Sequence, residues 1–219
     1  MKPGSTERTT LRRIAHKASH ELSDLYSILD DNLVAHVGVV EDGRPLVIPM
    51  TYGRSGNKLY LHGSSGSRLM RLLAENSNVC VSITELNALK VARSTFNSGM
   101  HYRAAVIFGK AELVADGEKL AALDALSDGL IPGRNPEARP TTKKELAATI
   151  IISVDLSETS VKISKNEVDD PEADLNKGFW AGIIPIKTIA GEPIPADEES
   201  AGLPVPPSIL QFIARRQGN

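Results

Sequence analysis

The chain has 219 residues and a formal net charge of −2, from 25 Lys and Arg residues against 27 Asp and Glu residues, which argues against a strongly basic nucleic-acid-binding protein. Hydrophobic residues make up 41% of the sequence, enough for a packed core, but no run approaches the roughly 18 consecutive apolar residues of a membrane span. The single cysteine, Cys80, excludes an internal disulfide, and the polar N-terminal stretch has no secretory-signal pattern, so we expect a cytoplasmic protein.

The first third of the chain predicts an arm, a helix and three strands. Residues 1–20 are polar and without a period, which favours an arm, and the apolar spacing after Glu21 predicts a helix that ends near Asp30. Apolar runs predict strands over 33–40, 46–53 and 58–63. Because Asp42-Gly43 is a strong hairpin signal, these strands are expected to form an antiparallel meander, with Pro49 at an edge or a bulge.

Helices and strands alternate along the rest of the chain. Helical spacing predicts a short helix that begins at Arg68 and two further helices over 117–131 and 208–216. Apolar runs predict strands over 78–86, 101–116, 149–157, 159–166 and 180–189. We expect 149–157 and 159–166 to pair with each other as the closing strands. The acidic stretch 167–174 predicts a solvated loop.

The predicted fold class is α+β, mainly β. Short turns join the first three strands, whereas a parallel sheet needs a helix in every connection, so an antiparallel β-barrel with inserted helices is favoured. We expect three parts: an arm over 1–20, the barrel over 21–166, and a return strand and tail over 167–219 that pack on the barrel.

The junction from Leu61 to Arg68 is the sharpest candidate site. Its sequence, Leu61-His62-Gly63-Ser64-Ser65-Gly66-Ser67-Arg68, combines small residues, hydroxyls and a guanidinium ahead of a predicted helix. Free backbone amides and an arginine suit a phosphate. The alternative is a serine N-cap with Arg68 in solvent. The stretch is neither a Walker A loop nor a dinucleotide fingerprint, because it lacks the required lysine and glycine spacing.

Two further segments are candidates for a pocket wall. His101-Tyr102-Arg103 begins a long strand, where a cation and an aromatic ring either line a pocket or form a rim salt bridge. Trp180, the only tryptophan, is either a core or interface anchor or a ligand contact. No metal site is expected. Because no pair of nucleophile and base is recognisable, a bound cofactor is expected to carry any chemistry.

Four segments of the chain resemble the FMN-binding split-barrel family. They read GRPLVIPMTYG (43–53), GNKLYLHGSSGSRLMRLL (56–73), VARSTFNSGMHYRAAVIFGKAELV (91–114) and FWAGIIPIKTIAGEPIPA (179–196). In order and spacing they are similar to the pyridoxamine 5′-phosphate oxidase-related branch, which includes nitroimidazole-resistance proteins. The resemblance implies a six-stranded antiparallel split barrel that forms a homodimer, with two FMN sites at the interface.

The resemblance also implies which residues bind FMN: a strand along the flavin ring, a turn along the ribityl chain, a Ser-Arg pair on the phosphate, and three side chains from the same or the partner subunit. In that order they are Val47, Ile48, Pro49, Met50, Thr51 and Tyr52; Leu61, His62, Gly63 and Ser64; Ser67 and Arg68; and Tyr102, Arg103 and Trp180. A further phosphate charge would come from Arg71 or Arg93. His62 is the candidate catalytic residue, as a proton donor or contact on the substrate side; the alternative is a packing role in the flavin site.

The function implied by the resemblance is an FMN-dependent oxidoreductase. It would reduce a small organic acceptor, such as a nitro-aromatic compound, with electrons from NADH or NADPH, and would need neither nucleic acid nor a membrane. One alternative is pyridoxamine 5′-phosphate oxidase-like activity, although the C-terminal substrate motif of those enzymes is missing. Another is a flavin- or haem-binding protein without turnover; no histidine follows His101, which counts against a C-terminal haem ligand.

Overall fold

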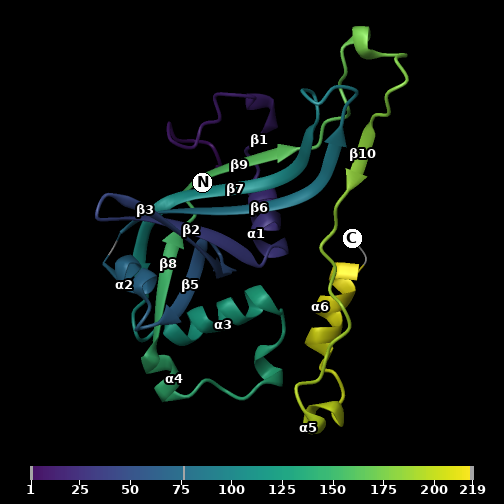
Figure 1. Cartoon of the computed structure of the whole chain (residues 1–219). Coiled ribbons are helices and arrows are strands. Elements are labelled where there is room, and N and C mark those ends of the chain that lie inside the picture. Colours follow the sequence, from purple (N-terminus) through teal and green to yellow (C-terminus); the bar gives the residue numbers. More distant parts are fainter. Residues whose placement is uncertain (1, 76, 218–219) are drawn as a thin grey trace.

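The computed structural model describes residues 2–75 and 77–217, so the predicted outer limits at Met1 and Asn219 lie outside the described residues. Its helices are α1 (Leu22–Asp31), α2 (Arg68–Ala74), α3 (Lys119–Leu130), α4 (Lys143–Ala148), α5 (Glu198–Ala201) and α6 (Pro207–Gln217). Its strands are β1 (Ala18–Ser19), β2 (Val34–Glu41), β3 (Arg44–Thr51), β4 (Gly53–Ser55), β5 (Lys58–Ser64), β6 (Asn78–Val91), β7 (Gly99–Leu113), β8 (Thr149–Asp155), β9 (Glu158–Ser164) and β10 (Gly182–Pro185). Figure 1 shows mainly β structure with helices on its faces and ends, which confirms the predicted α+β class.

All the strand pairs are antiparallel, and the main hydrogen-bonded order is β3-β2-β6-β7-β8-β5-β4. The long strands β6 and β7 form the centre of this order. Strand β9 also pairs with β7, β10 pairs with the distal half of β6, and β1 pairs with β9. Because β3 is a terminal strand of the order, the expected edge position of Pro49 is confirmed.

The two ends of the strand order are neighbours in the chain, because only Tyr52 separates β3 from β4. The chain bends there from one part of the sheet to the other, and the Tyr52 hydroxyl donates to the carbonyl oxygen of Leu29 at 2.7 Å. The two ends of the sheet are therefore joined by the bend of the chain at Tyr52. In the described strand order, β3 and β4 are not paired with each other by hydrogen bonds. The count of six barrel strands and the homodimer stay predictions.

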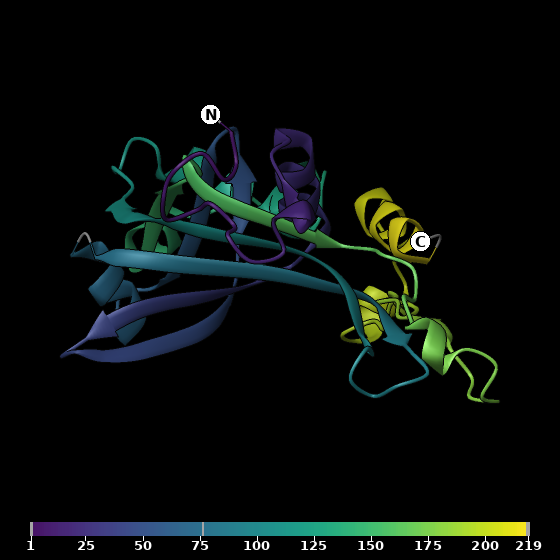
Figure 2. The ribbon, with the colours of Figure 1, turned by 90° about the horizontal axis from the view of Figure 1, so that it is seen from above.

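The core is aliphatic and lies inside the curled sheet. Alternate residues of the strands point into it, and α1 and α2 contribute Ile28 and Met70, both fully buried. Helix α3 packs Ala122 and Leu126 on the other face of β5 and β8, against the fully buried Ile151. This arrangement leaves the opposite side of β3, β2, β6 and β7, here called the outer face, uncovered by these helices (Figure 2).

The register corrects two predictions of strand pairing. The third strand of the predicted meander, β5, pairs with β8 and with the short β4, not with β3. The predicted closing strands 149–157 and 159–166 do not pair with each other. Instead, β8 pairs with residues 111–113 of β7 and β9 with residues 102–108, so both lie along the same edge of β7.

The two ends of the chain reach the sheet at separate places. The N-terminal arm follows β9: the Gly4 amide donates to the Thr159 carbonyl oxygen at 2.8 Å, and Arg8 lies 5.0 Å from the centre of the Phe108 ring. After β10 the chain runs past α5 to α6, whose Arg216 donates to the Asp31 carbonyl oxygen at 3.0 Å. The predicted division at 20/21 and 166/167 stays a prediction.

Candidate functional site

The predicted phosphate-binding junction joins β5 to α2. The Ser67 hydroxyl accepts a hydrogen bond from the Met70 amide at 3.4 Å, so Ser67 is an N-cap. The neighbouring serines keep their side chains at the surface, where Ser64 accepts from the Gly66 amide at 3.2 Å. Hydroxyls and a guanidinium at one exposed turn are the donors that a phosphate requires.

Arg68 is the exposed cation of this junction, and it is paired with Glu41. Its Nε donates to Glu41 Oε1 at 2.8 Å and its Nη2 donates to Glu41 Oε2, in a two-pronged contact. The hydrogen bond from Arg68 lowers the pKa of the Glu41 carboxyl. The pair borders an open cavity of about 390 Å³ at the β2–β3 hairpin, lined by Glu41, Asp42, Arg44, Pro45, Leu46 and Arg68.

Strand β3, which the resemblance places along the flavin ring, leads away from this cavity. Its Val47 and Ile48 side chains are 58% and 37% exposed, which is unusual for apolar residues in a strand of a packed sheet. Tyr52, at the end of the predicted stretch, is buried instead, and this burial raises the pKa of its hydroxyl. The stretch therefore offers an exposed apolar strand that ends in a core residue.

His62, the candidate catalytic residue, lies on β5 opposite Ile151. Leu61 points into the core, so His62 points to the other face, the side on which α3 packs. Its Nδ1 is buried and has no hydrogen-bond partner, and it is the sole buried side-chain nitrogen or oxygen so placed among the described residues. Burial lowers the pKa of this imidazole. An orphaned polar atom of this kind is costly unless a ligand or water completes it.

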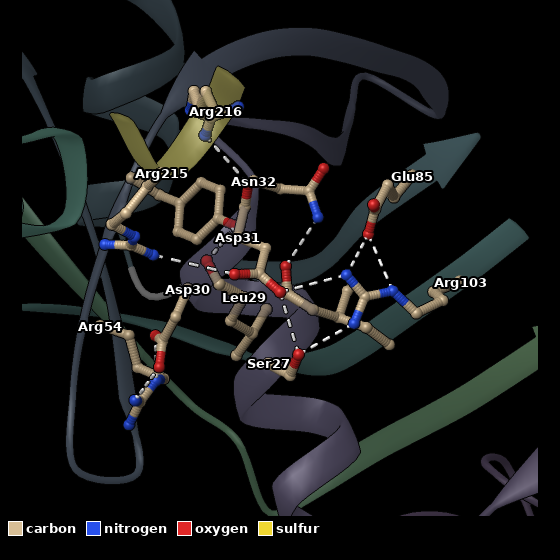
Figure 3. A network of polar contacts seen from close by, with 12 residues as sticks. Ser27, Leu29, Asp30, Asp31, Asn32, Arg54, Glu85, Arg103, Arg215 and Arg216 are labelled. Carbon is tan, nitrogen blue, oxygen red and sulfur yellow. Dashed lines mark hydrogen bonds and ion pairs between the residues drawn. The ribbon is translucent and has the colours of Figure 1, made fainter. Parts of the chain in front are cut away.

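Arg103 takes part in a polar network far from Arg68. Figure 3 shows its guanidinium between Glu85, Ser27 and Asp31. The Nε donates to Glu85 at 2.8 Å, Nη1 donates to Ser27 at 2.8 Å and Nη2 donates to Asp31 at 3.1 Å. The network stands at the end of α1 and beside the middle of β6.

The strand register shows that this network and the phosphate junction lie at opposite ends of β2. Glu41, the partner of Arg68, is the last residue of β2, whereas Asp31 precedes its first residue, Val34. One subunit therefore does not bring Arg103 to the Ser67-Arg68 pair. The resemblance allowed for the alternative, a contribution of Tyr102 and Arg103 to the site of a partner subunit.

The network borders a second cavity, of about 310 Å³, that the sequence did not predict. It is lined by residues of α1, β6, β7, α3, β10 and α6 and by the segment after β10, among them Asp31, Glu85, Arg103, Lys187, Phe212 and Arg215. The contributing residues come from the whole length of the chain, and no local pattern joins them. Several of their charges pair within the wall, as the Arg215–Asp31 contact at 3.8 Å illustrates.

Trp180 lies on the outer face of the sheet, beside β10. A Cβ added to Gly182 would stand 2.8 Å from the indole, so the ring covers that glycine. The indole remains 65% exposed, and next to it Met100, Leu89 and Ile184 form an exposed apolar row across three strands. Of the two readings of Trp180, the structure excludes a buried core residue and leaves an interface anchor or a ligand contact.

The remaining candidates have structural partners. The His101 Nε2 lies 2.7 Å from the Asn166 carbonyl oxygen, Arg93 donates to Asp170, and Arg71 donates to the Gly66 carbonyl oxygen at 2.7 Å. Arg93 therefore fastens the acidic loop to the hairpin between β6 and β7. Among the described residues no cluster of three or more His, Cys, Asp or Glu side chains is placed to hold a metal ion.

The family is shown by comparison with known proteins. The family model described as pyridoxamine 5′-phosphate oxidase matches residues 21–163, which is most of the chain, so the chain belongs to this flavin-binding family. A comparison with curated proteins found no match. In the part of the chain that the structure describes, no helix has the length and apolar character to cross a lipid bilayer.

Several solved structures are similar to this one. An FAD and heme binding protein from Mycobacterium smegmatis is 42% identical, with 90% of this chain and 97% of that chain covered and a TM-score of 0.87. A flavocytochrome from Azotobacter vinelandii is 34% identical, with coverages of 94% and 96% and a TM-score of 0.87. A putative 5-nitroimidazole antibiotic resistance protein from Bacteroides thetaiotaomicron, at 22% identity, covers 67% of this chain and 86% of its own with a TM-score of 0.57, and shows a shared fold.

Proposed function

We propose that this protein is a flavin-dependent oxidoreductase that acts on a small organic acceptor, with NADH or NADPH as the electron donor. The observation that carries the proposal is the position of Arg68. Its exposed guanidinium stands at a hydroxyl-rich turn, beside a strand with exposed apolar residues, in a chain of a flavin-binding family. These are the parts that a ligand with a phosphate at one end and a flat apolar ring at the other requires.

Different residues would bind different parts of the flavin. Arg68 would bind the phosphate nearest the ribityl chain, with hydroxyls of the same turn as further donors. The free edge of β3 from Val47 onward would run along the ring and offer it backbone groups, with the partly exposed side chains of Val47 and Ile48 on either side of the strand. FMN, the cofactor that the sequence resemblance implies, and FAD, after which one relative is named, share these parts, so the same residues serve either.

A bound flavin supplies hydride and electron transfer, which no side chain can perform. The protein would contribute position and one proton-carrying group. His62 is that group in our proposal, because its Nδ1 is buried and has no hydrogen-bond partner among the described residues; it lies on the α3 side of β5, so an acceptor would meet it on that side of the sheet. A neutral imidazole can exchange a proton with a bound acceptor near neutral pH.

The homodimer belongs to the same proposal. The outer face carries exposed apolar side chains that a monomer would leave in water: Val34, Val40, Val47, Leu86, Leu89, Met100 and Ile184. Exposed apolar side chains gathered on one face of a protein are typical of protein interfaces. A second copy placed on this face could bring its Tyr102 and Trp180 toward the flavin, which one subunit alone does not do. Arg103 points to the opposite side of β7, where it binds Ser27 and Asp31 of α1. We also propose a cytoplasmic location.

A second candidate function is a flavin- and haem-binding protein. It is favoured by the two relatives of 42% and 34% identity, one described as an FAD and heme binding protein and the other as a flavocytochrome. Of the five histidines, His36 is exposed on the outer face, where a ligand between two subunits would meet it. The relatives thus outweigh the argument from the missing C-terminal histidine.

The first experiment is an absorbance spectrum of the purified protein before and after titration with flavin. Flavin bands that saturate at one per subunit, followed by bleaching with NADH or NADPH without oxygen, would support the oxidoreductase. An additional Soret band that shifts on reduction would support the flavin- and haem-binding protein. A colourless protein that takes up no flavin would contradict both.

A further inference from the structure

We propose that the cavity between the end of α1, α6 and the segment after β10, here called the α6 cavity, binds a small organic acid with two negative charges. Its volume of about 310 Å³ is that of a site for a small molecule. Lys187, Arg215 and Arg216 are the cations that would hold the ligand. The inference does not rest on the proposed function, because Arg68 lies at the opposite end of β2.

The charges in the wall of the α6 cavity do not balance. Three carboxylates and four cations line it: Asp30, Asp31 and Glu85, and Arg103, Lys187, Arg215 and Arg216. Asp30 is bound by Arg54, which lies outside the wall, through hydrogen bonds of 2.8 and 2.6 Å. Arg103 alone donates to the other two carboxylates, at 2.8 Å to Glu85 and 3.1 Å to Asp31. The wall therefore has two positive charges in excess, although the chain as a whole has a net charge of −2.

The excess is carried by cations with weak partners or none. Arg216 donates to a neutral group, the Asp31 carbonyl oxygen, at 3.0 Å, and Arg215 lies 3.8 Å from the Asp31 carboxylate, beyond hydrogen-bond reach (Figure 3). The exposed ammonium group of Lys187 has no hydrogen bond or ion pair among the described residues. Both arginines offset the dipole of α6, but Lys187 belongs to no helix, so the dipole does not account for the group. A bound anion would relieve the repulsion between these like charges.

The wall that carries the arginines is fixed at both ends of α6. At the first turn, the Ser208 amide donates to Glu137 Oε1 at 3.0 Å and the Ser208 hydroxyl donates to the same carboxylate. At the last turn, Arg216 makes its bond to the end of α1. Phe212 lies between these two points and lines the cavity together with Leu130. Cations held in place beside apolar side chains suit a small organic anion, because little has to be ordered when it binds.

The test follows thermal unfolding of the full-length protein, as purified, while succinate, inorganic phosphate or acetate is added at constant ionic strength. A ligand that binds the folded state alone raises the melting temperature with its concentration, which gives its affinity. We expect succinate, phosphate or both to bind at least about fivefold more tightly than acetate, because the second charge adds one contact. Tighter binding of succinate alone would identify a dicarboxylate, and of phosphate alone a phosphate ester.

Lys187→Met removes one charge of the cavity and should weaken binding of the dianion at least about fivefold. The control is Lys144→Met, because Lys144 is also an exposed lysine but lies on α4, outside the cavity. It should bind the dianion as the parent protein does. Equal affinities for acetate and both dianions, or an equal change in the two lysine variants, would overturn the inference.

Arg68→Ala distinguishes the α6 cavity from the proposed flavin site, where an added phosphate could also bind. The α6 cavity keeps all its cations in this variant, so the affinity for the dianion should stay within about twofold of the parent value. Loss of anion binding in Arg68→Ala, with Lys187→Met unchanged, would place the anion at the β5–α2 junction. That result would overturn this inference and leave the proposed function intact.

Discussion

Arg68 is the residue on which the proposed flavin site most depends. Its guanidinium is bound by Glu41, so a phosphate must compete with a carboxylate for the same donors. Exposed pairs of this kind contribute little to stability. The pair can therefore open for a ligand without cost to the fold.

Arg68→Ala is expected to weaken flavin binding by about tenfold to a hundredfold, since a charge-assisted contact to the phosphate is lost. The free energy of unfolding of the flavin-free protein should barely change. Arg139→Ala is the matched control, because Arg139 is 68% exposed and paired with Glu145, much as Arg68 is 67% exposed and paired with Glu41. Fluorescence titration measures the affinities. Unchanged binding in Arg68→Ala would mean that another group holds the phosphate.

The buried imidazole of His62 leads to a prediction about the stability of the fold at low pH. Burial lowers the pKa of its imidazole below the ordinary 6.5, so the unfolded chain binds a proton at a pH where the folded chain does not. Stability that is fully present above about pH 6.5 is therefore lost as the pH falls toward the folded pKa. In His62→Gln this loss should be smaller.

The measurement is urea unfolding of flavin-free protein at about pH 7.5 and about pH 5.5, on either side of the unfolded pKa. His16→Gln serves as the control, because His16 is exposed in the N-terminal arm. It should lose as much stability on acidification as the parent protein. The same loss in His62→Gln would show that His62 does not contribute to it.

At the scale of elements, α3 is fixed to the bent strand by two glycines that touch. A Cβ on Gly129 would stand 2.7 Å from Gly53 Cα and 2.9 Å from the Tyr52 carbonyl oxygen, and a Cβ on Gly53 would stand 2.3 Å from the Ala125 carbonyl oxygen. Contacts to backbone atoms at these distances cannot be relieved by a side-chain rotation. The helix can approach the bend only because both residues lack a side chain.

Gly129→Ala is therefore expected to destabilise the protein by about 1–3 kcal/mol through overpacking, although alanine is normally the better helix former. Gly117→Ala is the control, since a Cβ at Gly117 meets no atom within 4 Å. It should be neutral or slightly stabilising. Thermal unfolding measures both, and equal melting temperatures for the two variants would contradict the close contact.

The sequence predicted the elements better than it predicted their partners. The α1, α2 and α3 helices and the β2–β3 hairpin follow from apolar spacing, the Ser67 cap and the Asp42-Gly43 turn, which are local signals. The choice of β7 as the common partner of β8 and β9 depends on residues far apart in sequence. No residue near Asp155 indicates that β8 and β9 pair one after the other with β7 instead of pairing with each other in a hairpin.

The candidate site shows the same limit. Ser67 and Arg68 could be found because a small-residue turn before a helix is visible in the sequence. Arg68 is paired with Glu41, and Arg103 is paired with Glu85. The partners are far apart in the sequence, so no local pattern indicates either pair. Arg103 was expected near a cofactor, and within one subunit it lies instead at the end of α1.

At the scale of the whole molecule, the exposed apolar residues of the outer face predict that the protein binds flavin only as a dimer. Val34→Lys places a charge on this face, where Val34 is 47% exposed, and is expected to yield a monomer that releases its flavin. Leu113→Lys is the matched control: Leu113 is 56% exposed but points to the opposite side of β7. Light scattering gives the mass and absorbance gives the retained flavin. A Val34→Lys monomer that keeps its flavin would refute a site at the interface.

The terminal position of β3 also bears on aggregation. A strand at the end of a sheet presents backbone donors and acceptors that another chain can pair with, and exposed apolar residues such as Val47 and Ile48 increase that hazard. Pro45 and Pro49 lie in the same strand, and neither has an amide hydrogen to offer. An incoming strand would meet two gaps within five residues. The strand can thus remain uncovered long enough to receive a ligand without seeding the growth of fibrils.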